Sequence, residues 1–182
     1  MSKQNIAADV DIVPKGGDGD WAYTDEVKKH FFQPQNIVLD IKDVKDYDGL
    51  GMVGSPACGD MMKIWIKVDK KADKILDMKW QTFGCGSAIA ATSMLSVMVS
   101  ENNGMSIDKA LKIKAQDITE RLHGLPIRKI HCSVLGDKAL RSAINSYFVK
   151  TKQTNRVIKE HARIIDKIAK VTDHDIEEAV LE

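Results

Sequence analysis

Apolar and polar residues alternate in two stretches near the middle of the chain. From Met61 to Asp69 every second position is apolar, and a second alternating run extends from Ile75 to Thr82. Alternation of this kind predicts β-strands with one buried face. The polar segment 69–74 separates the two runs by only a few residues, so we expect the strands to form an antiparallel hairpin. On the first strand the buried face is predicted to carry Met62, Ile64, Ile66 and Val68.

The pattern changes to helical spacing on both sides of this hairpin. Residues 23–32 are predicted to form a helix, with Thr24 as the N-cap and Pro34 beyond the end. Ser87 is predicted to cap a longer helix that runs to about residue 102. We therefore expect helices to cover one face of the sheet.

Shorter helices are predicted over residues 106–113 and 117–123, and residues 37–47 are predicted to form an edge strand. Ser133 is expected to cap a further helix. Its apolar face is predicted to consist of Leu135, Ala139, Leu140, Ala143, Ile144 and Tyr147.

Composition excludes several classes of partner. The 182 residues include 27 basic and 26 acidic side chains, a formal net charge of +1, which gives no general attraction to nucleic acid or to a membrane. No apolar run is long enough to span a bilayer. An odd number of cysteines without a secretion signal indicates free thiols in a reducing compartment, so we expect a cytoplasmic protein.

The three cysteines lie in contexts that favour chemistry over packing. Cys58 lies in GSPACGD (54–60), Cys85 in FGCGS (83–87), and Cys132 directly follows His131. Flanking glycines allow sharp turns that can present a sulfur atom to a ligand. Together with Asp60 and His131, the cysteines provide sulfur, oxygen and nitrogen ligands that suit iron or zinc.

Each cysteine taken alone has a simpler interpretation, because an isolated cysteine usually behaves as a small buried hydrophobe. No Cys-x-x-Cys pair occurs, and the spacing matches no zinc finger. Against this interpretation, Cys85 and Cys132 are both predicted to precede a helix. The partial positive charge of a helix N-terminus stabilises a thiolate.

Three segments together resemble one known family. They are residues 54–60, TFGCGSAIA (82–90) and LPIRKIHCS (125–133). Over residues 23–146 the chain resembles the IscU/NifU-type scaffolds of iron–sulfur cluster assembly. The resemblance implies an α+β fold, in which helices pack mainly on one face of a three-stranded antiparallel sheet. It also divides the chain into a flexible arm (1–21), an IscU/NifU N-terminal-like scaffold domain (22–150) and a helical C-terminal extension (151–182).

The resemblance also implies a site and a function. Cys58, Cys85 and Cys132 would bind the nascent cluster, and Asp60 or His131 would supply the fourth ligand. Cys132 would accept sulfur, with electrostatic support from Lys129. The cargo would be a transient 2Fe–2S cluster, with 4Fe–4S as the alternative, and zinc can occupy the same ligands. Such a protein is a carrier and not a turnover enzyme.

The partners implied by the resemblance are a cysteine desulfurase, apo iron–sulfur proteins, DnaK/DnaJ-type chaperones, ferredoxin, a frataxin-like protein and a second copy of the chain. The chaperone-recognition stretch of the family is Leu-Pro-Pro-Val-Lys. Here it reads Leu125, Pro126, Ile127, Arg128, Lys129. Loss of the second proline makes the segment less stiff, which weakens the expectation of chaperone binding.

Asp60 has a chemical role that does not depend on the resemblance. A hard carboxylate is a poor match for iron–sulfide, so three thiolates with one carboxylate form a weaker shell than four thiolates. A cluster held in this way can be released.

Three other functions fit parts of the sequence. A SufU-like zinc protein for sulfur transfer would use the same cysteines with Asp60. A thiol enzyme would need Cys132 as nucleophile and His131 as base, although neighbours in sequence seldom have that geometry. A plain interaction module would not need the cysteines at all.

Overall fold

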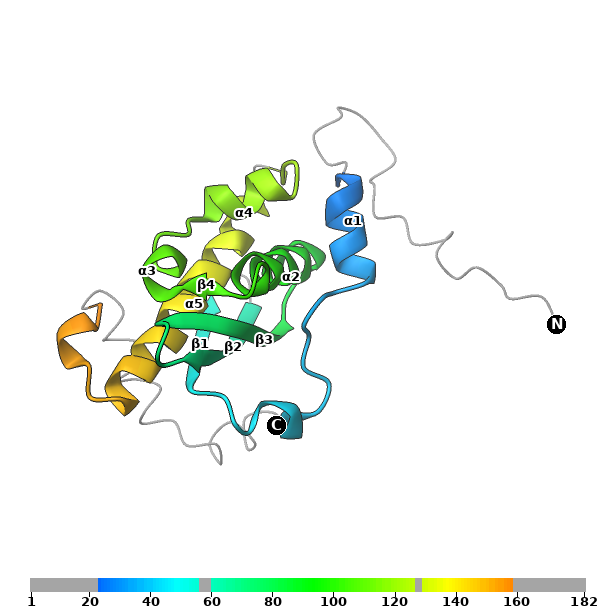
Figure 1. Ribbon diagram of the computed structural model, residues 1–182. Coiled ribbons are helices and arrows are strands. Elements are labelled where there is room, and N and C mark those ends of the chain that lie inside the picture. The colour runs from blue at the N-terminus through cyan, green and yellow to red at the C-terminus, as the bar shows by residue number, and fades with distance from the viewer. Residues whose placement is uncertain (1–22, 56–59, 127–128, 159–182) are drawn as a thin grey trace, which may run out of the picture.

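The structure is a computed structural model that describes residues 23–55, 60–126 and 129–158. For residues 55, 60 and 130–134 it describes the backbone but not the side chain. Figure 1 shows the arrangement of its elements. In chain order they are α1 (Asp25–Phe32), the 3-10 helix η2 (Ile41–Val44), β1 (Gly49–Ser55), β2 (Asp60–Asp69), β3 (Lys74–Phe83), α2 (Gly86–Ser100), β4 (Met105–Ser106), α3 (Ile107–Ala110), α4 (Ala115–Arg121), α5 (Ile130–Lys150) and the 3-10 helix η4 (Thr154–Arg156).

The strands form one antiparallel sheet in the order β1-β2-β3-β4. The predicted hairpin is confirmed as β2 and β3. The prediction of three strands is wrong, because the sheet has four. The additional strand β4 has two residues, which pair with Lys74 and Ile75. A strand this short shows no alternation, so its pairing depends on where the chain returns after α2.

Helices α2 and α5 cover one face of the sheet, as predicted, and α1 packs on α2 (Figure 1). The predicted apolar face of β2 lies beneath them, with Met62, Ile64 and Ile66 fully buried. The predicted apolar face of α5 is also buried. Burial of these two faces against each other supplies the main hydrophobic stabilisation of the fold.

A small second core lies on the opposite face of the sheet, where Trp65 packs with Val38 and Val44. The predicted edge strand over residues 37–47 is wrong. This described segment contains η2, and its β-pairing with the sheet is limited to one isolated parallel bridge between Ile37 and Trp80. The Asp40 side chain accepts a hydrogen bond from the Lys42 N–H, and this cap favours a turn over an extended strand.

Of the predicted N-caps Thr24, Ser87 and Ser133, the first is confirmed and the other two are wrong. Thr24 caps α1 by accepting a hydrogen bond from the Val27 N–H at 3.2 Å. Helix α2 begins at Gly86 with Cys85 as N-cap, ahead of Ser87, and α5 begins at Ile130 with Lys129 as N-cap, ahead of Ser133. A serine in the first turn resembles a cap in sequence, but the backbone hydrogen bonds determine where the helix begins.

The ends of the chain are described only in part. Residues 151–158 form a turn and η4, whereas the predicted arm (1–21) and the remainder of the predicted helical extension lie outside the described residues. The domain boundaries therefore stay predictions. Among the described helices, none is both long and apolar enough to cross a membrane.

Candidate functional site

Cys85 lies at the junction between β3 and α2. Its backbone is extended, and its carbonyl oxygen accepts hydrogen bonds from the N–H groups of Ala88 (2.9 Å) and Ile89 (3.1 Å). The half-buried side chain makes no capping hydrogen bond to the helix. The thiol therefore lies at the positive end of a 15-residue helix, where a thiolate is favoured.

The ends of β1 and β2 lie at this same edge of the sheet. Ser55 pairs with Asp60, and Met61 pairs with Phe83 two residues before Cys85. The backbone of Asp60 is thus next to the end of β3. Cys58 lies in the segment 56–59, outside the described residues, which connects these two described strand ends.

Helix α5 brings its first turn to the same end of the sheet. It runs antiparallel to β1, since Gly49 lies against Ala143 and Gly51 against Ala139. From Gly51 to Ser55 the strand advances about 13 Å. The same distance along a helix takes about nine residues, which leads from Ala139 to the start of α5.

The structure describes the sequence-predicted ligands to three extents: Cys85 with its side chain, Asp60, His131 and Cys132 by their backbone alone, and Cys58 not at all. The backbone positions of Asp60, Cys85, His131 and Cys132 lie at one end of the sheet, although the side chains of Asp60, His131 and Cys132 are outside the described part. Cys58 itself is also outside it. Among the side chains that are described, no three of His, Cys, Asp and Glu form a group that could hold a metal.

The segment predicted to resemble a chaperone-recognition stretch leads into α5. Leu125 is buried in the core, and the N–H of Lys129 donates to the carbonyl oxygen of Pro126 at 2.7 Å. Ile127 and Arg128 lie outside the described residues. The half-buried Lys129 is the N-cap of α5 and precedes Cys132 by three residues. Its supporting role stays a prediction.

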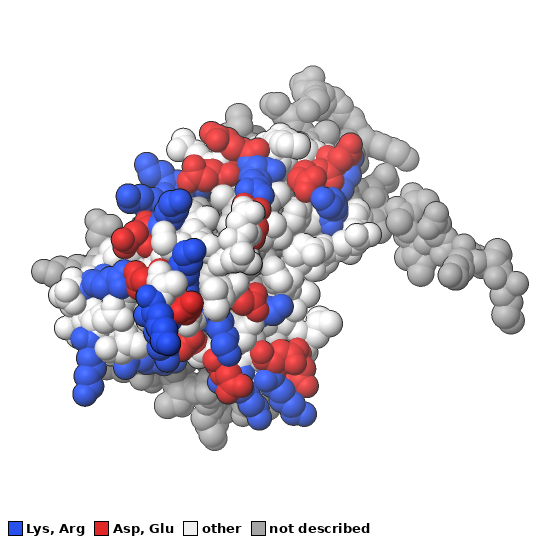
Figure 2. All heavy atoms as spheres, in the orientation of Figure 1, with Lys and Arg blue, Asp and Glu red and all other residues white. Residues whose placement is uncertain are grey.

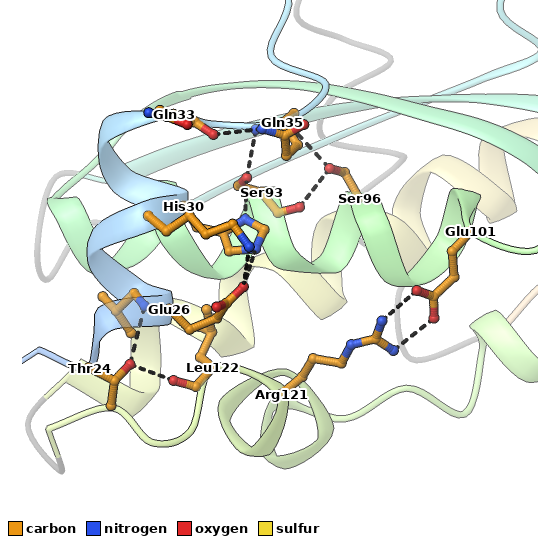
Figure 3. Close-up of polar contacts among 12 residues, drawn as sticks. Thr24, Glu26, His30, Gln33, Gln35, Ser93, Ser96, Glu101, Arg121 and Leu122 are labelled. Carbon is orange, nitrogen blue, oxygen red and sulfur yellow. Dashed lines mark hydrogen bonds and ion pairs between the residues drawn. The ribbon is translucent and has the colours of Figure 1, made fainter.

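The start of α1 connects the first turn of α2 to the end of α4. The Tyr23 hydroxyl lies 2.8 Å from that of Ser87, two residues after Cys85. The Thr24 hydroxyl donates to the carbonyl oxygen of Leu122 at 2.6 Å (Figure 3). These contacts fix the helix that carries Cys85 against its neighbours.

A buried polar network farther along α2 was not predicted from the sequence. The Ser93 hydroxyl accepts a hydrogen bond from the Gln35 N–H (2.8 Å) and lies 2.7 Å from His30 Nδ1 (Figure 3). The Ser93 hydroxyl can donate to Nδ1 when neutral His30 carries its proton on Nε2, which lies 3.4 Å from Glu26 Oε1. Burial lowers the pKa of His30. The signal available in the sequence was the set of hydroxyl side chains Thr92, Ser93 and Ser96 among the apolar residues of this helix.

A pocket of about 580 Å³ opens next to this network, between α1, α2 and the end of α4. Its lining includes His30, Lys29, Arg121 and Met94, and contains none of the sequence-predicted ligands. Met94 lies roughly 13 Å along α2 from Cys85. The pocket and the cysteine end of the sheet are therefore separate places.

Charges of both signs are interspersed over the face shown in Figure 2. No extended surface of one sign appears on that face. This distribution agrees with the balanced composition and does not resemble a nucleic-acid interface.

Comparison with known proteins decides the family. Residues 22–154 match the family model described as the NifU-like N-terminal domain. The chain belongs to this family. The resemblance predicted from the three cysteine segments is thereby confirmed.

Members of the family from several organisms align with most of the chain. The iron–sulfur cluster assembly scaffold protein IscU 1 of Archaeoglobus fulgidus is 45% identical over 135 residues, which cover 74% of this chain and 82% of that relative. The iron–sulfur cluster assembly enzyme IscU of Drosophila melanogaster is 47% identical over 132 residues, covering 72% and 81%. The nitrogen fixation protein NifU of Trichormus azollae is 45% identical over 129 residues, or 70% of this chain but 42% of the longer NifU.

A solved structure supports the fold. The NifU-like N-terminal protein from Brucella abortus superposes with a TM-score of 0.52 over 70% of this chain and 94% of that chain, at 17% sequence identity. At this identity the likeness concerns the fold alone.

Proposed function

We propose that this protein is a scaffold on which an iron–sulfur cluster is assembled and from which it is transferred. The observation that carries the proposal is the meeting of three chain segments at one end of the sheet: the β1–β2 connection, the β3–α2 junction and the first turn of α5. Each segment contains one cysteine of the chain. Relatives in the same family are named as cluster assembly scaffolds.

Cys58, Cys85 and Cys132 are the proposed cluster ligands, with Asp60 or His131 as the fourth. Cys85 caps α2 and Cys132 lies in the first turn of α5. Two helix N-termini therefore lie close to the proposed site, and their partial positive charges favour the anionic sulfur of a thiolate or a cluster. His131 and Cys132 differ by about 100° around the helix axis, so they face different directions from one backbone.

The described end of β3, two residues before Cys85, is open to solvent. Phe83, at the end of β3, is 71% exposed. A storage site would be covered, whereas a carrier must let a cysteine desulfurase deliver sulfur and an apo-protein remove the cluster. We propose these two classes of protein as partners, and a 2Fe–2S cluster as the cargo. The reducing cytoplasm is the proposed location, because the thiols must stay reduced.

Anaerobic reconstitution of the full chain with ferrous iron, a cysteine desulfurase, cysteine and dithiothreitol, which reduces the delivered persulfide sulfur to sulfide, tests the function. We expect the wild type to gain sulfide-to-iron charge-transfer absorption together with equal amounts of iron and acid-labile sulfide. Cys58→Ser, Cys85→Ser and Cys132→Ser should each lose stable cluster while keeping their far-UV circular dichroism.

A protein that binds zinc and accepts persulfide, but forms no cluster, would contradict the scaffold proposal and support the zinc-dependent sulfur-transfer alternative. If the triple cysteine variant reconstituted like the wild type, the interaction-module alternative would gain support instead.

A further inference from the structure

The contact between β1 and α5 is unusually close. A Cβ atom added at Gly51 would lie 2.1 Å from the carbonyl oxygen of Ala139 and 2.4 Å from the backbone nitrogen of Ala143. At Gly49 it would lie 2.3 Å from the carbonyl oxygen of Ala143. Neither residue has a positive φ, so these glycines are required for space and not for backbone conformation.

The crowded atoms belong to the helix backbone, so rotation of a side chain cannot relieve the clash. Heavy atoms that are not bonded pack at about 3.5 Å. A side chain at Gly51 would therefore move α5 away from β1 by about 1 Å. Because α5 is a continuous helix from Ile130 to Lys150, its first turn would move with it.

We infer that Gly51, supported by Gly49, is a positioning residue that sets the reach of Cys132 toward the other ligands. The inference rests on the proposed function. Cys85 is carried by β3 and α2, whereas Cys132 is carried by α5, and β1 joins α5 to the sheet. Metal–ligand distances tolerate deviations of about 0.2 Å, so a displacement of about 1 Å at one ligand is several times too large.

Gly136 provides a matched control on α5 itself. A Cβ there would meet the end of the Leu95 side chain at 3.2 Å and the Thr92 hydroxyl at 3.9 Å, both side-chain atoms. Leu95 can adjust without moving either backbone. Gly136→Ala therefore adds the same methyl group to the same helix without lifting α5 from the sheet. A second control, Leu140→Ala, removes a buried side chain from α5 and destabilises the protein without a wedge.

Cobalt(II) titration of the reduced full chain under argon tests the inference, with thiolate-to-cobalt charge transfer reporting how many sulfur atoms bind. Gly51→Ala should keep its circular dichroism, bind cobalt about 10- to 100-fold more weakly than the wild type, and show less charge transfer per bound ion. The folded fraction of Gly136→Ala and of Leu140→Ala should bind cobalt with an affinity within about twofold of the wild-type value.

If folded Gly51→Ala bound cobalt with wild-type affinity and spectrum, the inference would be overturned and the proposed function left standing. A wild type without thiolate charge transfer would overturn the proposed function as well. Should Gly51→Ala fail to fold, Gly49→Ala supplies a second wedge between β1 and α5, against the carbonyl oxygen of Ala143. It should lower cobalt affinity more than Gly136→Ala does, and equal affinities of these two variants would count against the inference.

Discussion

The guanidinium group of Arg156 donates hydrogen bonds of 2.9 and 2.7 Å to the two carboxylate oxygens of Asp73, a residue 83 positions earlier in the chain. Asp73 lies in the β2–β3 turn, at the end of the sheet opposite the cysteines. Arg156 also stacks over the Phe148 ring at 4.5 Å. The pair holds η4 against the β2–β3 turn.

Arg156→Ala should lower the free energy of unfolding by about 1 kcal/mol, because a charge-assisted pair and a ring contact are lost at a partly exposed position. Urea denaturation measures this change. Lys42→Ala is the control, since the ion pair of Lys42 with Asp40 is long, at 3.9 Å, and exposed. Equal stabilities of Arg156→Ala and Lys42→Ala would mean that the Arg156 contacts do not stabilise the fold.

The same pair predicts a pH dependence. The hydrogen bond from Arg156 holds the pKa of Asp73 below its ordinary value. A depressed carboxyl pKa contributes stability that is present at neutral pH and is lost as the pH falls through the folded-state pKa. The difference between the wild type and Arg156→Ala should therefore shrink in acid.

Cys85→Ser should remove cluster binding without destabilising the fold. The Cys85 side chain makes no capping hydrogen bond to α2, and serine is among the best N-cap residues. We expect unchanged stability or a gain of about 0.5 kcal/mol by thermal denaturation, together with the loss of stable cluster on reconstitution. A destabilisation of more than about 1 kcal/mol would show that the thiol has a structural role.

His30 should make stability depend on pH near neutrality. Burial is the main cause of its lowered pKa, and Glu26 partly opposes the effect. Since the unfolded chain binds a proton more readily than the folded one, stability should fall as the pH drops below the ordinary histidine value of about 6.5.

His30→Gln should flatten this dependence between about pH 7.5 and 5.5, as measured by denaturation at each pH. A slope in His30→Gln as steep as that of the wild type would assign the titration to another group.

Asp60→Ala should give a longer-lived cluster, because it removes a hard ligand that matches iron–sulfide poorly. The rate at which visible absorption decays in the presence of an iron chelator measures the lifetime. Faster loss from the variant than from the wild type would show that Asp60 holds the cluster and does not make it labile.

The parts of the fold that the sequence predicted are those with a strong period. Ile64 and Ile66 occupy alternate positions of a run flanked by Lys63 and Lys67, and Leu140 and Ile144 are spaced as on a helix, so their burial follows from the hydrophobic pattern. Thr24 was identified as a cap because its position ahead of two acidic residues is typical of one. The predictions failed where a tertiary contact determines the structure.

Residues 37–47 illustrate such a failure. The segment begins with apolar residues that favour a strand, but Asp40 stabilises a turn, and Leu39 is left 87% exposed. The two residues of β4 likewise pair only because the preceding turn returns them to Ile75.

The glycine-flanked cysteines predicted the candidate site. The long-range contacts that position its segments could not be predicted from the sequence. Nothing in the sequence pattern distinguishes Gly51, whose missing side chain lets the α5 backbone pack closely on β1, from a glycine in a turn. The burial of His30 could not be predicted either, since its partner Ser93 is 63 residues away. Local motifs can identify ligands, but the contacts that position them are long-range.

X-ray absorption at the zinc edge of the zinc-loaded full chain tests most directly whether the three thiols meet. The account predicts three sulfur atoms at about 2.3 Å and one nitrogen or oxygen ligand at about 2.0–2.2 Å. A zinc ion with one sulfur ligand or none would contradict it, because the three thiols would then not converge on one metal site.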